Sequence, residues 1–282
     1  MLRGIYTGAS GMIVQMHMMD VLANNMANVD TTGYKRDTAV TKAFPDLLLR
    51  RLGDDGVYKF PFGSAETAPI VGKLGTGVEL NEVYTVFQQG GLKQTGNPFD
   101  MALKGPGFFS VETPEGERYT RNGTFQITQD GLLVDESGNP VLGVHGLIHL
   151  KMNNFVVDRE GKIYQNADYA GDPTRLVSKE GNDWKNTQLV DQLKIVDFGE
   201  RRYLKKQGNS LWKATEESGP PALADLGAKT QVEEGFLETS NVNPVTSMVR
   251  LIEVNRAYEA NQKTIQEQDT LAGRLINDAV KV

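Results

Sequence analysis

The sequence predicts an α+β fold: long N- and C-terminal helices pair as an antiparallel coiled coil, and a central β-rich domain of short hairpins lies between them. Apolar residues recur at alternating spacings of three and four near both ends of the chain, which is typical of paired helices. A ten-residue hairpin-like pattern occurs twice in the middle of the chain. The 30 glycines among 282 residues exceed the usual share of ~7%, which favours a fold with many tight turns.

The first helix is expected from about Leu2 to Ala27. Between residues 1 and 29 the only charged side chains, apart from His17, are Arg3 and Asp20. A helix whose outer faces meet water usually carries more charge, so neighbouring subunits are predicted to cover this one. Packing of an amphipathic helix on its own domain is the alternative. The expected helix–helix seam has the a and d spacing of a coiled coil and consists of Leu2, Ile5, Ala9, Met12, Met16, Met19, Ala23 and Met26.

The second helix is expected to begin at Asn243-Pro244, because asparagine is a good N-cap and proline suits the first helical position. Its seam is predicted to contain Met248, Leu251, Asn255, Tyr258, Gln262 and Ile265. Asn255 and Gln262 are polar, which weakens a seam but can set its register.

Two hairpins are predicted from the repeated pattern, at residues 125–134 and 155–164. Both segments have phenylalanine first, isoleucine or valine third, an acidic residue sixth, glycine seventh and leucine or isoleucine ninth. An acidic residue followed by glycine favours a tight turn between short strands. We therefore expect Gly131 and Gly161 to occupy equivalent turns with positive φ.

The expected domains follow from these patterns. Residues 1–34 together with 240–282 form a helical domain, residues 35–84 form an extended connector, and residues 85–239 form the β-rich domain. Within the connector, the leucine-rich segment 44–51 is expected to contain a turn of helix.

Most kinds of chemical site have little support. The net charge of −6 does not favour nucleic acid, because nucleic-acid binders concentrate positive charge. There is no cysteine to supply a thiolate ligand. His145 and His149 would lie ~13 Å apart on a strand, too far for one metal ion, and no carboxylate pair stands out. We therefore expect no catalytic, cofactor-binding or metal residue.

Membrane insertion is not expected either. No run of 18 apolar residues is present, as a membrane-spanning helix would need. The first ten residues contain no continuous apolar segment of the kind found in a secretory signal peptide.

Three segments resemble signatures of the flagellar rod and hook protein family. Residues 22–35 resemble LANNLANVNTxGYK, residues 95–109 resemble TGNPLDLAIxGxGFF, and residues 235–244 followed by 256–261 resemble GxLExSNVNxxxE and QRAYEAN. The chain departs from these signatures at Val254-Asn255 and at residues 248–250. The signature residues in the first segment are Ala23, Asn24, Asn25, Ala27, Asn28, Thr31, Gly33 and Tyr34.

The resemblance implies a structural protein without enzymatic activity or cofactor. Its two terminal helices would line an axial tube, with the β-rich domain outside. Its partners would be copies of itself, other flagellar rod and hook proteins, and the flagellar type III export apparatus, which would export it to the basal-body rod without a cleaved signal peptide.

Two shorter segments of the sequence indicate which position in the rod the chain would occupy. Residues 2–12 and 44–49 are more similar to the proximal rod protein than to the distal rod protein, which is the alternative. The length of 282 residues leaves no room for the additional outer domain of the hook protein.

An unrelated function is the remaining alternative: a free-standing β-rich protein that binds or hydrolyses carbohydrate. Such a protein would present clustered aromatic side chains in a cleft. The two tryptophans, Trp184 and Trp212, lie far apart in the sequence.

Overall fold

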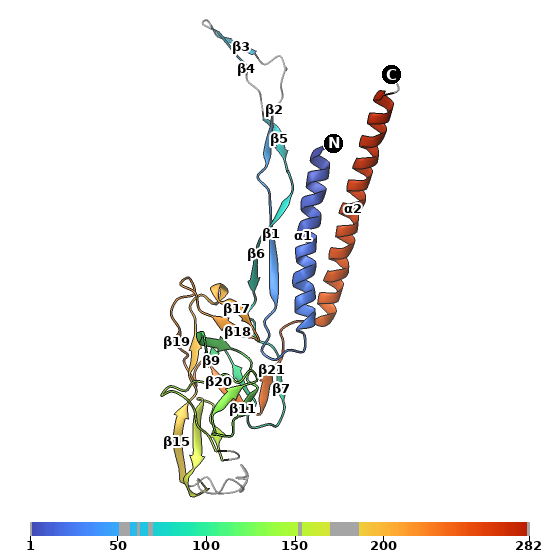
Figure 1. Ribbon diagram of the computed structural model, residues 1–282. Coiled ribbons are helices and arrows are strands. Elements are labelled where there is room, and N and C mark those ends of the chain that lie inside the picture. Colours follow the sequence, from blue (N-terminus) through green and yellow to red (C-terminus); the bar gives the residue numbers. More distant parts are fainter. Residues whose placement is uncertain are drawn as a thin grey trace. The chain divides into compact units, whose positions relative to one another are not determined.

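The computed structural model describes residues 2–50, 57–60, 63–66, 70–151, 154–169 and 186–280. It has the predicted α+β class. Helix α1 (Leu2–Ala27) lies near the N-terminus, helix α2 (Pro244–Val280) lies near the C-terminus, and the strands lie between them in the sequence (Figure 1). The chain forms two compact units. The helical unit contains residues 1–26, 37–84 and 244–282, and the β unit contains residues 27–36 and 85–243.

In the helical unit, the described strands between residues 37 and 85 form three two-stranded pairs. Strand β1 (Asp37–Ala43) pairs with β6 (Val78–Thr85), β2 (Leu47–Arg50) with β5 (Ile70–Leu74), and β3 (Val57–Phe60) with β4 (Gly63–Glu66). We call these six strands the ribbon; it is drawn as a long, narrow element in Figure 1.

The turn of helix expected within residues 44–51 is wrong for its described part. Residues 47–50 form strand β2, in which Leu47 lies opposite Leu74 and Leu49 opposite Gly72. A leucine-rich tetrapeptide is too short to hold a helix by itself, because helix nucleation is costly. Pairing with β5 supplies backbone hydrogen bonds that a single helical turn would not.

Helix α1 contacts the ribbon through small polar side chains. The hydroxyl of Thr7 donates a hydrogen bond to the carbonyl of Thr76 at 3.4 Å. The hydroxyl of Ser10 accepts one from the backbone N–H of Val78 at 3.3 Å. These bonds satisfy backbone groups where the return strand β6 begins.

The β unit is organised around a six-stranded antiparallel sheet. Smaller two- and three-stranded sheets complete it, together with the 3-10 helices Ala167–Tyr169 and Arg201–Tyr203. The order of the main sheet is β17 (Lys205–Gly208), β18 (Leu211–Lys213), β10 (Gly116–Thr120), β9 (Phe108–Thr113), β16 (Ile195–Asp197) and β19 (Ala222–Leu223). The smaller sheets contain β7 (Leu92–Gln94) with β21 (Phe236–Glu238), β8 (Met101–Lys104) with β20 (Gln231–Glu234), β11 (Phe125–Ile127) with β12 (Leu133–Asp135), and β13 (Val156–Val157), β14 (Lys162–Asn166) and β15 (Thr187–Gln192).

Strand β9 separates two clusters of buried apolar side chains. Successive side chains of a strand point to opposite faces of its sheet, so Phe108 and Phe109 enter different clusters. Phe109 packs in the larger cluster with Phe125, while Phe108 packs in the smaller one with Trp212. Burial on both faces of β9 gives the β unit a hydrophobic core of its own.

The two predicted glycine turns are confirmed. Gly131 has φ of 81° and Gly161 has φ of 69°. Gly131 donates to the carbonyl of Thr128 at 2.9 Å, and Gly161 donates to that of Asp158 at 2.8 Å. The first turn joins β11 to β12 and the second joins β13 to β14, both antiparallel pairs. The repeated sequence pattern thus encodes the same local structure twice.

The described part of the chain contains no helix that is both long and apolar enough to span a membrane.

Candidate functional site

Helices α1 and α2 approach each other closely through glycines of α1. A β-carbon placed on Gly8 would lie 2.9 Å from Cγ1 of Ile265, and one placed on Gly11 would lie 2.8 Å from Nδ2 of Asn261. Gly4 faces Gln268 in the same way, at 3.2 Å. Contacts move backwards along α2 as they move forwards along α1, so the helices run antiparallel, side by side (Figure 1).

The buried stripe of α1 lies next to the predicted seam. Gly8, Gly11 and Val14 are buried in α1, whereas Met16 is 47% exposed. Gly4, Gly8 and Gly11 each stand one residue before a predicted seam position. The two helices approach most closely at these glycines, where no side chain separates the backbones. Among the other seam residues, Ala23 is exposed and the half-buried ones are Ile5, Ala9, Met12, Met19 and Met26; the side chain of Leu2 lies outside the described part.

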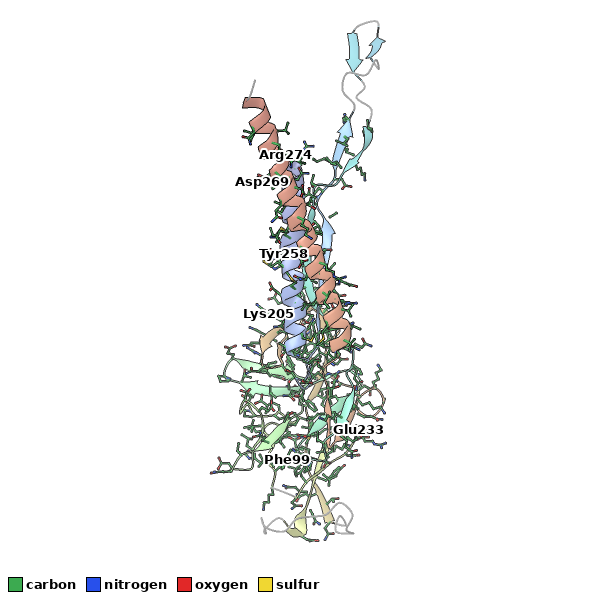
Figure 2. The ribbon with its side chains drawn as sticks, turned by 90° about the vertical axis from the view of Figure 1, so that its right-hand side faces the viewer. Phe99, Lys205, Glu233, Tyr258, Asp269 and Arg274 are labelled. Carbon is green, nitrogen blue, oxygen red and sulfur yellow. The ribbon has the colours of Figure 1, made fainter. Side chains whose placement is uncertain are left out.

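The seam of α2 divides between two faces. Leu251, Tyr258 and Ile265 are half-buried, while Asn255 and Gln262 are exposed and Met248 is 55% exposed. Figure 2 shows α2 along its length, with Tyr258 and, further on, Asp269 and Arg274. The structure therefore does not bring all the predicted seam residues into one contact within the chain. The half-buried or buried positions of α2 with three-and-four spacing are Ser247, Leu251, Val254, Tyr258, Asn261, Ile265, Gln268 and Ala272.

Large apolar side chains remain exposed on both helices and on the ribbon. Contiguous exposed apolar surface usually marks an interaction site. The exposed set contains Tyr6, Ile13 and Met16 on α1; Val245, Met248, Val249, Ile252, Leu271, Leu275 and Ile276 on α2; and Leu47, Leu48, Leu49, Ile70 and Val71 on β2 and β5. We call these three sets of side chains the exposed apolar surfaces.

Asn25 is the one signature residue of α1 that is buried; Ala23, Asn24 and Ala27 are exposed. Its amide Nδ2 donates to the carbonyl of Asp37 at 2.8 Å, and its Oδ1 accepts from the N–H of Asp37 at 2.9 Å. One side chain thereby satisfies both backbone groups at the start of β1.

The remaining signature residues make a tight turn in the β unit. The hydroxyl of Thr31 donates to Oδ1 of Asn28 at 3.2 Å. Gly33 has φ of 66°, and a β-carbon there would lie 2.5 Å from the backbone of Arg121, so only glycine fits. Tyr34 is buried, and the ammonium of Lys206 lies 4.4 Å from its ring centre.

A buried ion cluster follows directly after this turn. Its members are Lys35, Arg121 and Glu238, of which none is more than 4% exposed. One carboxylate oxygen of Glu238 accepts from Nζ of Lys35 and from the N–H of Gly90; the other accepts from Nη1 of Arg121 at 3.3 Å. The carboxylate therefore has a donor on each oxygen and two cations beside it.

Each cation of the cluster has a second bond to the backbone. Lys35 Nζ donates to the carbonyl of Gln88 at 3.0 Å, and Arg121 Nη2 donates to that of Gly105 at 2.7 Å. Burial lowers the pKa of Lys35, and Glu238 opposes that change by attracting the charged form. Burial also lowers the pKa of Arg121, again with Glu238 acting in the opposite direction.

Sequence reasoning missed this cluster. The available signal was that Lys35 and Glu238 stand inside the quoted signature segments, each as a charged residue in an otherwise largely uncharged stretch. Arg121 had no such signal, and only the fold brings it to the other two.

In the part of the chain that the structure describes, no group of three or more His, Cys, Asp or Glu is placed to hold a metal ion. The ring Nδ1 of His145 lies 2.7 Å from Oδ1 of Asp191. The histidine side chain is 81% exposed, whereas the Asp191 side chain is 7% exposed.

Three protein-family models match the chain. They are described as flagella basal body rod protein, flagellar hook protein FlgE/F/G D1 domain, and flagellar basal body rod FlgEFG protein C-terminal, and they match residues 5–35, 102–165 and 233–278. The flagellar basal-body rod protein FlgG of Buchnera aphidicola subsp. Schizaphis graminum is 32% identical over 280 residues, covering 98% of this chain and 99% of the relative. The chain belongs to the flagellar basal-body rod protein family.

Other relatives within this family bear different names. The flagellar hook-basal body complex protein FlhO of Bacillus subtilis is 30% identical over the full length of both chains. The flagellar basal-body rod protein FlgF of Caulobacter vibrioides is 29% identical, covering 99% of this chain and 98% of the relative. As a member of the rod family, the chain is a structural component of the flagellar basal body rather than an enzyme.

The three matched segments of this rod-family chain meet in the ion cluster. Lys35 lies in the first, Arg121 in the second and Glu238 in the third. The cluster thus joins the parts of the chain that carry the family likeness.

Proposed function

We propose that this chain is a subunit of the helical rod that carries torque from the flagellar motor to the hook. It polymerises with copies of itself and with other rod and hook proteins. The observation that supports this most directly is the set of exposed apolar surfaces, where large apolar side chains as exposed as Tyr6 (72%) and Val245 (68%) lie on both helices. Surfaces of this kind are stabilised when a partner covers them.

In this proposal, α1 and α2 pair as an antiparallel coiled coil that lines the axial tube. Residues 1–34 and 240–282 form that tube, residues 85–239 form the outer domain, and residues 35–84 connect the two. The close approach of Gly8 to Ile265 supports the pairing. The exposed seam residues, among them Met16 and Met248, then face neighbouring subunits.

The proposed mechanism is mechanical. Many long helices packed at the density of a protein interior resist twisting, because sliding one helix past another would break packed contacts along its whole length. The apolar β2–β5 part of the ribbon adds a further surface for contact with a neighbouring subunit. No chemical step is needed for this function.

Within the rod we propose the proximal position, with the distal position as the alternative. The support is the likeness of residues 2–12 and 44–49 to the proximal rod protein. Identities of 32% to a FlgG and 29% to a FlgF do not separate the positions. Labelling the β unit with a small tag and locating the tag in images of intact basal bodies would decide between them.

The chain leaves the cytoplasm, in the same proposal, through the flagellar type III export apparatus and without cleavage of a signal peptide. The likeness of residues 22–35 to the family signature supports this route. Mass spectrometry of subunits taken from purified rods provides the test. The intact N-terminal peptide is expected, and a shortened one would contradict the proposal.

Binding or hydrolysis of carbohydrate is the unrelated alternative. It calls for exposed, clustered aromatic rings. Trp212 is 1% exposed and its ring centre lies 4.9 Å from that of Phe87, so it serves the core. Trp184 lies outside the described residues.

Substitution of Met16 by aspartate tests the assembly role of the α1 surface. Burying an unpaired carboxylate between subunits costs several kcal/mol or forces its protonation. Even ~2 kcal/mol per contact would lower each association constant roughly thirtyfold. We expect Met16→Asp to abolish rod assembly while the β unit keeps its thermal stability.

The matched control is His17→Asp, which adds the same charge at the adjacent exposed position. Basal bodies would be purified from cells that carry each variant, and thermal unfolding would be measured on each soluble protein. Normal rods with Met16→Asp would contradict the proposed surface. A destabilised β unit would instead mean that α1 belongs to its core.

A further inference from the structure

The last strands of the β unit complete sheets that begin much earlier in the chain. Strand β20 pairs with β8, with Val232 opposite Leu103, and β21 pairs with β7. Val232 is 2% exposed and belongs to the larger apolar cluster. That cluster is therefore incomplete until residues 231–241, here called the closing segment, are in place.

Backbone and side-chain hydrogen bonds join the closing segment to the N-terminal part of the unit. The N–H of Gly33 donates to the carbonyl of Glu238 at 2.8 Å. The N–H of Arg36 donates to Oδ1 of Asn241 at 2.8 Å, and Nδ2 of Asn241 donates to the carbonyls of Val86 and Gln88 at 2.8 and 3.0 Å. The closing segment thus supplies hydrogen-bond partners for backbone groups of residues 33, 36, 86 and 88, which lie outside the strands.

Glu238 is the carboxylate that both buried cations share. Lys35 and Glu238 lie 203 positions apart in the sequence. If the rest of the unit closed without the closing segment, Lys35 and Arg121 would be two like charges held in a site that excludes water. A buried charge whose partner is removed is strongly destabilising, and here one removal affects two charges.

We propose that Glu238 couples folding of the whole β unit to docking of the closing segment. Until residues 231–241 dock, the cations and the exposed edges of β7 and β8 keep the unit open. Docking supplies the carboxylate and the strands together, and the unit then becomes stable as a whole. A chain that emerges N-terminus first therefore holds no stable β unit until Glu238 has emerged. The proposal concerns folding of the single chain, so it stands or falls separately from assembly into a rod.

Hydrogen exchange on the full-length protein tests the coupling. The variant is Glu238→Gln, which keeps the shape of the side chain and removes its charge. The matched control is Glu233→Gln on the neighbouring strand β20 (Figure 2), where the half-buried carboxylate makes no described contact with Lys35 or Arg121. The readout is the exchange rate of the amides of Phe109 and Val111 in β9, which are far along the chain from the substitution.

If folding of the β unit is coupled to docking of the closing segment, Glu238→Gln raises the hydrogen-exchange rates of the β9 and β21 amides by a similar factor, on the order of a hundredfold or more. The control leaves the β9 rates within a few-fold of the wild type. A Glu238→Gln protein that is unfolded while Glu233→Gln is folded also supports the proposal. Faster exchange confined to β7 and β21, with β9 as protected as in the wild type, would overturn it.

A second variant, Lys35→Met, is expected to give β9 exchange rates between those of the wild type and of Glu238→Gln. Lys35→Met removes one cation and leaves Glu238 paired with Arg121, so the β9 amides are expected to exchange faster than in the wild type but more slowly than in Glu238→Gln. The reverse order would contradict the shared role of Glu238.

Discussion

Asn25 holds both backbone polar groups of Asp37 with one side chain, at 2.8 and 2.9 Å. Asp37 is the first residue of β1, where the ribbon begins. A buried amide of the right geometry satisfies a backbone donor and a backbone acceptor at once. The conformation of a signature residue on α1 is thereby tied to the start of the ribbon.

Replacing Asn25 by alanine is expected to loosen the start of the ribbon. Loss of both bonds removes the Asn25 amide as donor and acceptor for the backbone of Asp37, at a cost of about 1–3 kcal/mol. Asn25→Asp keeps an acceptor for the N–H but sets a second oxygen against the carbonyl, so it should cost at least as much. Faster hydrogen exchange at the Asp37 amide is the measurement, with His17→Ala, at an exposed site on the same helix, as control. Unchanged exchange in Asn25→Ala would contradict the role given to this side chain.

Gly33→Ala is expected to destabilise the β unit for two separate reasons. Its φ of 66° is unfavourable for alanine by about 1–2 kcal/mol, and the added carbon would lie 2.5 Å from backbone atoms of Arg121 and Asn122. Gly138→Ala is the matched control, because Gly138 has φ of 83° with open space around it. Urea unfolding should show a clearly larger loss of stability for Gly33→Ala. Equal losses would mean that the close approach contributes nothing.

Gly8→Leu is expected to disrupt the pairing of α1 with α2. Leucine favours a helix over glycine by nearly 1 kcal/mol, but at Gly8 the first added carbon already meets Ile265. Gly273→Leu makes the same substitution on α2 where nothing lies within 4 Å. Circular dichroism should show unchanged or higher helicity for Gly273→Leu, and hydrogen exchange should show lower protection along α1 for Gly8→Leu. Equal protection of α1 in both variants would contradict the glycine contact.

The stability of the β unit is expected to fall in alkaline solution partly because of Tyr119. Burial, with the nearby Glu117 charge, raises the pKa of Tyr119 from 10.0 to about 12. Between these values the unfolded chain has lost the phenolic proton and the folded chain has kept it, so rising pH favours unfolding. This contribution is fully present below pH 10 and is lost as pH rises to about 12. Comparing the pH dependence of unfolding in wild type and Tyr119→Phe isolates it, and identical slopes would exclude it.

The residues through which α1 and α2 contact each other were only partly predictable from the sequence. Apolar spacing indicated that both ends of the chain are helical, and α1 and α2 have that structure. The same spacing cannot distinguish a face that meets the partner helix from a face that meets another subunit, since both exclude water. Gly8 and Gly11 add no hydrophobic signal to the pattern, although they mark the place of closest approach.

The ribbon and the ion cluster were not predictable from local patterns. Residues 47–50 pair with a strand that begins at Ile70, so their pairing partner is not adjacent to them in the sequence. Lys35 and Glu238 are the kind of residue that usually lies in water, and their burial depends on a partner more than 200 positions away.

Features that arise within a few residues of chain could be predicted from the sequence alone: two terminal helices, from their three-and-four spacing, and the Gly131 and Gly161 turns, from an acidic residue followed by glycine. The sequence also carried the family likeness, because the signature segments are continuous stretches. Two features are evident only in the folded chain: the face of α1 that meets α2, and the ion cluster that Glu238 forms with Lys35 and Arg121. Those outcomes depend on long-range pairing, in which the free energy of excluding water from distant segments together outweighs what each segment favours alone.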